Sequence, residues 1–425
     1  MQSRSLSVWS KILSVFIILA ATLGCFGQAK TSLKLIKTIS NAELASWDRP
    51  FSRQGLLAVR TGNVVQLWDA QTGTVRSSVP LQGKLLDAFF SNDGETFFTS
   101  NKEKSTGVTT KLWNVQTGQL KTTLSGLLIY QPISKGLDAF MSLADRNELK
   151  FWNAQTGELT KTVRPYKDNF SNSKISFDGR RVIRYGDKKG FLWETDTGRL
   201  VAELKPPEQR DILIPWYADL KLWGAVFSPD SKVIATEDSL NSIELWDAET
   251  GRLLAFLQGH NSTIYALSFS PDGKLLASAS RDGTARIWEV QTGRLIDRVK
   301  AGKEIATRVI FNPEGTLLAI GYHTHAKIWD VSRAQVRATL TPHADVNKMV
   351  LFGSYLDSVE PLLSPQGKLL LTIGNKSVKV WTITGEPVMT IDAAHLPVSV
   401  SADDKVLVTT SRNGSVLLWA IEEET

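Results

Sequence analysis

The sequence predicts an all-β protein built from a repeated unit of four short strands. The first observation is the motif V-Q-L-W-D-A-Q-T-G at residues 65–73, which returns in similar form at 110–118, 149–157, 243–251 and 285–293. The second is its spacing, because nine motif tryptophans follow one another at intervals of 38 to 53 residues. The third is a turn of the type Ser-Pro-Asp-Gly ahead of a strand-like segment in several units. A period near 40–45 residues with Trp-Asp at a fixed place is typical of a propeller with four-stranded blades. The nine tryptophans are Trp68, Trp113, Trp152, Trp193, Trp246, Trp288, Trp329, Trp381 and Trp419.

The unit at residues 259–293 and the segment after it show how each part of the repeat specifies a structure. Side chains alternate in character over 265–270, as in a half-buried strand, and the turn at 270–273 supplies proline and glycine where their backbone angles fit. We expect the second strand at 275–280 and the third, which carries the tryptophan, at 284–290. A turn at Thr292 and Gly293 then leads into the fourth strand at 295–301.

Nine readable units predict a single closed propeller of about nine blades. Residues 30–425 divided among nine blades give 44 residues each. The alternative is eight blades, with the weak third repeat not forming one. The chain ends just after its ninth third strand, and the segment 33–39 resembles the fourth strands of other units. We therefore expect 33–39 to pair antiparallel with 415–421, which closes the ring and covers an open sheet edge.

These motifs resemble the WD-repeat (WD-40) family over residues 31–425. The resemblance implies that His260, Ser278, Asp282 and Trp288 form a structural set of hydrogen bonds. It also implies an interaction platform rather than an enzyme, so we expect no catalytic residue although histidine, serine and aspartate also occur in catalytic triads. The alternative function is a small-ligand-binding or hydrolase-type propeller with its site at the axial channel.

Residues 1–29 have the layout of a secretory signal, and residues 30–425 form the propeller. Arg4 and Lys11 precede an apolar run at 12–24, and small residues lead to a cleavage site after Ala29. Two alternatives are a lipoprotein signal ending at Cys25 and an uncleaved anchor. We expect the protein to be exported, either periplasmic, secreted or associated with the envelope.

Composition and motifs exclude several classes of function. The net charge is +6, and the basic residues form no cluster along the sequence. Both observations argue against a nucleic-acid partner. No phosphate-binding or nucleophile-elbow motif occurs, so we expect no cofactor. His323 and His325, with His343 nearby in the next blade, lack further carboxylate or cysteine ligands, so we expect no metal. Membrane contact is expected only through an N-terminal anchor or a lipid on Cys25.

Two long connections between units are unusually apolar and aromatic. They span residues 206–224 and 343–361, and exposed apolar clusters in loops mark contact surfaces. Trp216, Tyr217, Phe352 and Tyr355 are therefore the candidate residues for binding a protein or peptide partner. The alternative is that both connections fold back onto their own blades.

Overall fold

The computed structural model describes most of the chain beyond its first 29 residues. The described residues are 30–46, 50–91, 93–103, 107–128, 139–144, 148–153, 158–163, 172–185, 190–195, 197–205, 224–237, 241–300, 304–322, 324–340, 360–373, 377–392, 394–411 and 413–424. Within these ranges the secondary structure is all-β, and no helix is long and apolar enough to cross a membrane.

The described residues form nine antiparallel sheets of four strands each. The first three sheets in chain order comprise β2 (Glu43–Leu44), β3 (Leu56–Thr61), β4 (Val64–Asp69) and β5 (Thr74–Pro80); β6 (Lys84–Phe90), β7 (Thr96–Glu103), β8 (Gly107–Asn114) and β9 (Leu120–Ser125); β10 (Leu127–Leu128), β11 (Ala139–Ala144), β12 (Glu148–Asn153) and β13 (Leu159–Val163). The next three comprise β14 (Asn172–Ile175), β15 (Arg181–Tyr185), β16 (Gly190–Glu194) and β17 (Leu200–Leu204); β18 (Gly224–Phe227), β19 (Val233–Glu237), β20 (Ile243–Asp247) and β21 (Leu253–Leu257); β22 (Ile264–Phe269), β23 (Leu275–Ser280), β24 (Thr284–Glu289) and β25 (Leu295–Lys300). The last three comprise β26 (Ala306–Phe311), β27 (Leu317–Tyr322), β28 (Ala326–Asp330) and β29 (Gln335–Leu340); β30 (Glu360–Leu363), β31 (Leu369–Ile373), β32 (Ser377–Thr382) and β33 (Pro387–Asp392); β34 (Ala394–Val400), β35 (Val406–Ser411), β36 (Ser415–Glu424) and β1 (Lys30–Ser40).

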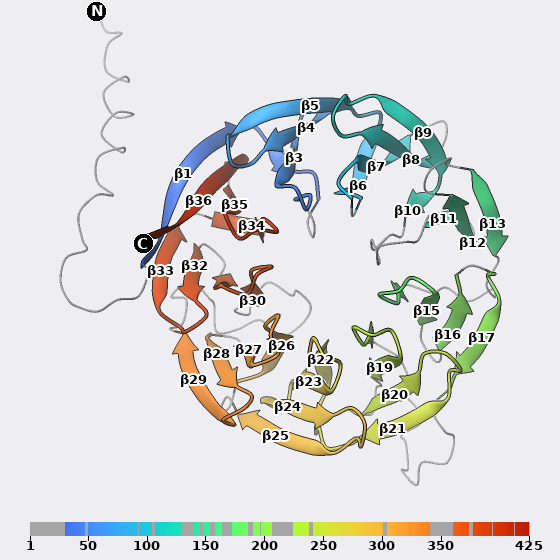
Figure 1. The fold of residues 1–425 in the computed structure, drawn as a ribbon, viewed down its shortest axis with the longest axis vertical. Helices are drawn as coiled ribbons and strands as arrows, with labels where there is room; N and C mark the ends of the chain where they lie inside the picture. The colour runs from blue at the N-terminus through green and yellow to red at the C-terminus, as the bar shows by residue number, and fades with distance from the viewer. Residues whose placement is uncertain are drawn as a thin grey trace, which may run out of the picture.

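The sheets stand side by side around a central axis, with the fourth strand of each at the periphery (Figure 1). Each motif tryptophan lies in the third strand of its sheet. In every described sheet the register between the third and fourth strands shifts beside the tryptophan, as between Ile287 and Trp288. The four strands expected around the 259–293 unit are observed within one residue of their predicted bounds. The weak third repeat also forms a sheet, β10–β13.

The N-terminal strand completes the last sheet, so the predicted pairing is confirmed. β1 runs antiparallel to β36 from Ser40 opposite Ser415 to Lys30 opposite Glu424, which is longer than the sequence suggested. A buried apolar cluster from β1, β35 and β36 continues into β3 and β4, and joins the last sheet to the first. The backbone N–H of Ala42 also donates to the carbonyl of Gly414 at 2.8 Å.

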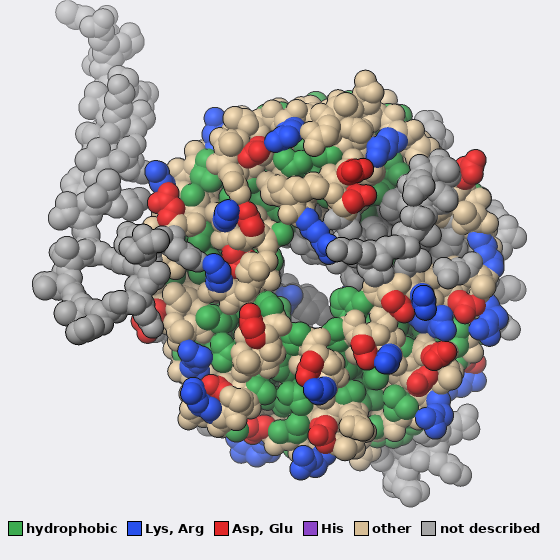
Figure 2. All heavy atoms as spheres, in the orientation of Figure 1, with side chains coloured by type: hydrophobic (Ala, Val, Ile, Leu, Met, Phe, Trp, Pro, Cys, Tyr) green, Lys and Arg blue, Asp and Glu red, His purple; other side chains and the backbone are tan. Residues whose placement is uncertain are grey.

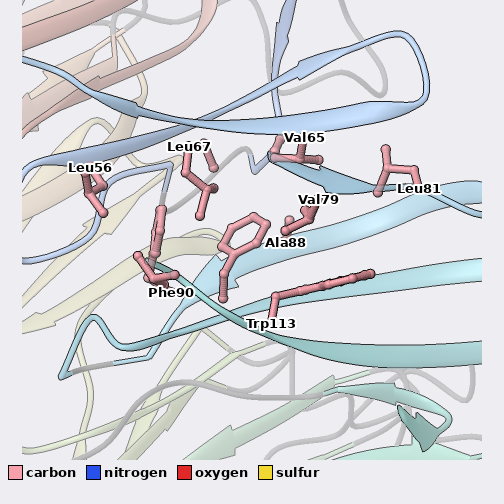
Figure 3. Packing of buried hydrophobic residues seen from close by; sticks show 12 residues of the cluster. Leu56, Val65, Leu67, Val79, Leu81, Ala88, Phe90 and Trp113 are labelled. Atoms are coloured by element: carbon pink, nitrogen blue, oxygen red, sulfur yellow. The ribbon is translucent and has the colours of Figure 1, made fainter. Parts of the chain in front are cut away.

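Apolar side chains fill the seams between neighbouring sheets. Figure 3 shows the seam between the first two sheets, where Leu56 and Val65 of the first sheet face Phe90 and Trp113 of the second. Leu56 marks one end of this cluster and Leu81 the other. Burying each such side chain contributes roughly 1.5–3 kcal/mol, so the seams supply much of the stability of the fold.

Two of the turns between first and second strands hold a non-glycine residue in the left-handed region where other repeats have glycine. Ser231 has φ 63° and Asp404 has φ 57°. Each side chain contacts the preceding sheet: Ser231 Oγ accepts from the N–H of Asp178 at 2.9 Å, and Asp404 Oδ1 accepts from the N–H of Gln366 at 3.0 Å. These contacts between sheets offset the backbone strain, which is of order 1–2 kcal/mol for a non-glycine residue.

Candidate functional site

Four side chains that the sequence singled out lie together beside β24. His260 lies in the connection before β22, Ser278 in β23, Asp282 in the turn after it, and Trp288 in β24. His260 Nε2 is 2.8 Å from Ser278 Oγ, and His260 Nδ1 is 2.9 Å from Asp282 Oδ2. Trp288 Nε1 donates to Ser278 Oγ at 2.9 Å. The four residues form a continuous hydrogen-bonded chain from the indole to the carboxylate, called the relay below.

The relay is satisfied throughout when His260 is neutral. Trp288 donates to Ser278, the Ser278 hydroxyl donates to Nε2 of His260, and Nδ1–H of His260 donates to Asp282. Burial lowers the pKa of His260 and outweighs the opposing effect of the Asp282 carboxylate, which favours the neutral ring. Burial raises the pKa of Asp282, but hydrogen bonds from Thr284, His260 and the Asn261 backbone outweigh it and lower this pKa to about 2.

Burial distinguishes the relay from a catalytic triad. The Ser278 residue has no exposed surface, and the His260 side chain is 1% exposed. In a serine-dependent triad the hydroxyl must reach a substrate carbon, with the histidine on its other side. Here the Ser278 oxygen is hydrogen-bonded to both Trp288 and His260. These bonds connect β23 to β24 and to the segment before β22.

Sequence reasoning missed two further members of this cluster, Thr284 and Arg286. The Thr284 hydroxyl donates to Asp282 Oδ1 at 2.6 Å. The Arg286 guanidinium donates to the Gly259 carbonyl at 2.5 Å and lies 5.9 Å from the centre of the Trp288 ring. Alternation along β24 was the available signal, because residues 284, 286 and 288 share one face of a strand.

The tryptophan part of the relay recurs in four other described sheets, in which a threonine stands opposite the tryptophan. Trp113, Trp246, Trp381 and Trp419 donate to threonine hydroxyls at 2.8–3.0 Å, and the acceptors are Thr99, Thr236, Thr372 and Thr409. In the described part of the chain, the buried indole N–H groups of Trp68, Trp193 and Trp329 have no acceptor.

The register explains these three exceptions. The hydroxyl always lies two residues beyond the second-strand residue that pairs with the tryptophan, as Ser278 lies beyond Leu276. At the same place the three exceptional sheets carry Val59, Arg184 and Ile320, none of which offers an acceptor in its side chain. The presence or absence of this bond can therefore be predicted from one sequence position per repeat.

A second polar cluster lies around His325, one of the histidines that we examined in the sequence as metal ligands and did not expect to bind a metal. His325 Nδ1 is 3.1 Å from Glu304 Oε2, and Thr324 Oγ1 donates to Glu304 Oε1 at 2.7 Å. The His325 ring stacks on Tyr322 with centroids 4.8 Å apart. Sequence reasoning found no carboxylate near these histidines and missed Glu304, which lies 21 residues earlier.

His323 and His343 lie outside the described residues. Among those that the structure describes, no three His, Cys, Asp or Glu side chains gather as metal ligands would. Burial lowers the pKa of His325, with Glu304 acting in the opposite direction.

The candidate partner-binding residues Trp216, Tyr217, Phe352 and Tyr355 also lie outside the described residues. The strands that flank them are described, however. One segment joins the outer strand β17 to the inner strand β18, and the other joins β29 to β30. Both segments therefore connect an outer strand to the next inner strand, as the sequence predicted.

Charged side chains alternate in sign over the face drawn in Figure 2. Lys and Arg side chains stand next to Asp and Glu around the ring, and the described residues on this face form no broad patch of one sign. Close ion pairs among the described residues include Arg60–Glu43 at 2.7 Å and Arg76–Asp69 at 3.3 Å.

Nine four-stranded antiparallel sheets around an axis, with a tryptophan in each third strand, are consistent with an all-β protein of the propeller class. Residues 251–289, which contain all four residues of the relay, match the family model of the WD domain, G-beta repeat. This match confirms the resemblance to the WD-repeat family.

A solved structure supports the same fold. The chain is similar to the crystal structure of the computationally designed Ika8 protein, with a TM-score of 0.57 and 20% sequence identity. The match covers 81% of this chain and 99% of the designed one. At this identity the likeness concerns the fold alone.

Proposed function

We propose that this chain is an exported propeller that binds other proteins and catalyses no reaction. Its ring consists of nine blades and is closed by the N-terminal strand, and its signal peptide is removed after Ala29. The partner contacts the two long connections at 206–224 and 343–361, with Trp216, Tyr217, Phe352 and Tyr355 as anchors.

The observation that carries this proposal is the buried relay in the repeat that matches the WD family. Its serine, histidine and aspartate are the residues best suited to chemistry in that repeat, and all three are engaged in holding strands and turns. WD repeats generally form surfaces for protein partners, and buried aromatic side chains dominate the energetics of such interfaces. Nine sheets and the β1–β36 pairing support a ring of nine blades.

Affinity capture tests partner binding. The chain serves as bait for envelope and secreted fractions of the source cells, beside a Trp216→Ala/Phe352→Ala variant. We expect the variant to recover at least about tenfold less partner than the unchanged chain, because an aromatic anchor at an interface contributes about 2 kcal/mol or more to the binding free energy. The variant should melt at nearly the same temperature as the unchanged chain.

The matched control is Phe177→Ala, which removes an aromatic side chain that is 55% exposed and lies outside both segments. Unfolding of the double variant would show that the two segments pack against the blades instead, and an equal loss of partner in the control would show that capture does not depend on these segments in particular.

The mass of the native protein tests export. Cleavage after Ala29 leaves Lys30 as the first residue, which is also the first residue of β1. A soluble cytoplasmic form that retains Met1 would contradict this part of the proposal.

A further inference from the structure

The turns between first and second strands meet their neighbours across the seams, and in three seams between consecutive described sheets a proline lies at this contact. Where the turn reads Ser-Pro-Asp-Gly or a close variant, the proline ring lies against the glycine of the next sheet's turn. A Cβ atom on that glycine would come within 3.8 Å of the proline Cδ or closer. The pairs are Pro229 with Gly273, Pro271 with Gly315, and Pro313 with Gly367.

The seam between the first two sheets lacks this closure. The first turn reads Phe-Ser-Arg-Gln-Gly at 51–55, so Arg53 stands where four later turns carry proline. The Gln54 side chain reaches toward Gly94 instead, and its amide donates to the Asp93 carbonyl at 2.5 Å. A cleft of about 450 Å³ remains at this end of the seam, a volume within the range of ligand sites.

The lining of this cleft is mostly polar. Its polar residues are Gln54, Arg76, Glu95, Asn114 and Gln116. Its apolar lining residue, Leu56, is 5% exposed and belongs to the buried cluster that fills the seam (Figure 3). The cleft therefore extends from a turn near the axis to the outer strand β5 and the turn before β9.

Several polar groups of the walls have bonding capacity left. Asn114 Oδ1 accepts from the N–H groups of Gln116 and Thr117 at 3.0 and 2.9 Å, and this leaves its NH₂ group available. Arg76 has one long bond to Asp69, at 3.3 Å, and further donors besides. The Gln116 amide and the Glu95 carboxylate have no hydrogen bond from another described side chain.

We propose that this cleft binds an extended polypeptide segment of another protein through its backbone. The Gln116 amide offers one acceptor and two donors, and the Gln54 amide, which already donates to Asp93, has one further donor; such groups match the C=O and N–H groups of a peptide. Arg76 and Glu95 add one charge of each sign, so the preferred segment carries an acidic and a basic side chain. The described lining contains no aromatic ring, the platform on which sugar rings usually stack, which favours a peptide over a carbohydrate.

This site shares no residue with the segments 206–224 and 343–361, so either proposal can fail alone. Short capped peptides test it directly by saturation-transfer NMR or calorimetry with the full chain. The probes are acetyl-Lys-Ser-Ser-Glu-amide, acetyl-Ala-Ser-Ser-Glu-amide and maltotriose. We expect the doubly charged peptide to bind two- to fivefold more tightly than the singly charged one, as an exposed ion pair of this kind provides.

Two exposed side chains and one matched control separate the site from the general surface. Glu95→Gln should remove the preference for the lysine-containing probe, and Gln116→Ala should weaken both peptides three- to tenfold through loss of hydrogen bonds. Gln291→Ala changes the equivalent glutamine of the sixth sheet's turn and should change neither affinity. Peptide binding that Gln116→Ala and Gln291→Ala affect equally would overturn the proposal. So would the absence of peptide binding, or binding of maltotriose in its place.

Discussion

Replacing Ser278 by alanine should destabilise the protein far more than its small size suggests. Its Oγ accepts from Trp288 at 2.9 Å and is bonded to His260 at 2.8 Å. The substitution removes one oxygen atom and leaves two partners without a bond. Trp288 is 1% exposed and His260 7% exposed, so water does not readily replace the lost hydroxyl.

The magnitude follows from the number of orphaned groups. A buried donor or acceptor left without a partner costs about 1–3 kcal/mol. Two such groups give an expected loss of about 2–6 kcal/mol for Ser278→Ala. The matched control is Thr409→Val, which preserves shape at a fully buried position and orphans only the Trp419 indole. Its expected loss is about 1–2 kcal/mol.

Urea unfolding followed by tryptophan fluorescence and by circular dichroism measures both losses. Coincident transitions establish that a single free energy of unfolding is defined, which a repeat protein does not guarantee. A Ser278→Ala loss no larger than that of Thr409→Val would refute the relay as a coupled structural unit.

The relay also predicts the direction of the pH dependence. Because burial lowers the pKa of His260, the unfolded chain binds a proton that the folded chain does not, and stability falls as the pH drops below about 6.5. The lowered pKa of Asp282 adds a second loss between about pH 4 and its folded value of about 2. His260→Gln should flatten the first of these slopes. An unchanged slope would show that other groups cause it.

Three further predictions concern other parts of the fold. Val59→Thr places a hydroxyl beside the unpartnered Trp68 indole and should change the unfolding free energy by less than about 1 kcal/mol. The control, Val65→Thr in the apolar seam, should lower the unfolding free energy by about 1–2 kcal/mol. Equal losses in urea titrations would contradict the register argument. Tyr322→Phe removes a buried hydroxyl that lacks a partner among the described residues, so the melting temperature should stay the same or rise. A clear drop in the melting temperature would show that the hydroxyl has a partner, such as a buried water. Deletion of residues 31–40 exposes the edge of β36 and should cause aggregation or marked destabilisation in light scattering and thermal melts, and a truncated chain that melts like the intact one would argue against closure by this strand.

The strands and their order were predictable from the sequence because each depends on a local pattern. Alternating side chains, a Ser-Pro-Asp-Gly type of turn and a tryptophan motif recur within about 40 residues, and each repeat specifies its own sheet. The relay was predictable only through the resemblance to the WD-repeat family, whose hydrogen-bonded positions His260, Ser278, Asp282 and Trp288 match within one repeat. Even the pairing of 33–39 with 415–421 followed from counting strands, because a sheet that lacks its fourth strand leaves an open edge.

Contacts between repeats were decided only by the tertiary structure. One contact within a repeat also needed the structure: Glu304, just before β26, lies 3.1 Å from His325 in the turn after β27. Asp404 accepts a left-handed backbone because the preceding sheet offers it the Gln366 N–H. The cleft beside Gln54 depends on how far two neighbouring turns stand apart across a seam. A repeat pattern describes each sheet by itself, but the geometry between two sheets depends on the side chains of both, and only packing brings those side chains together.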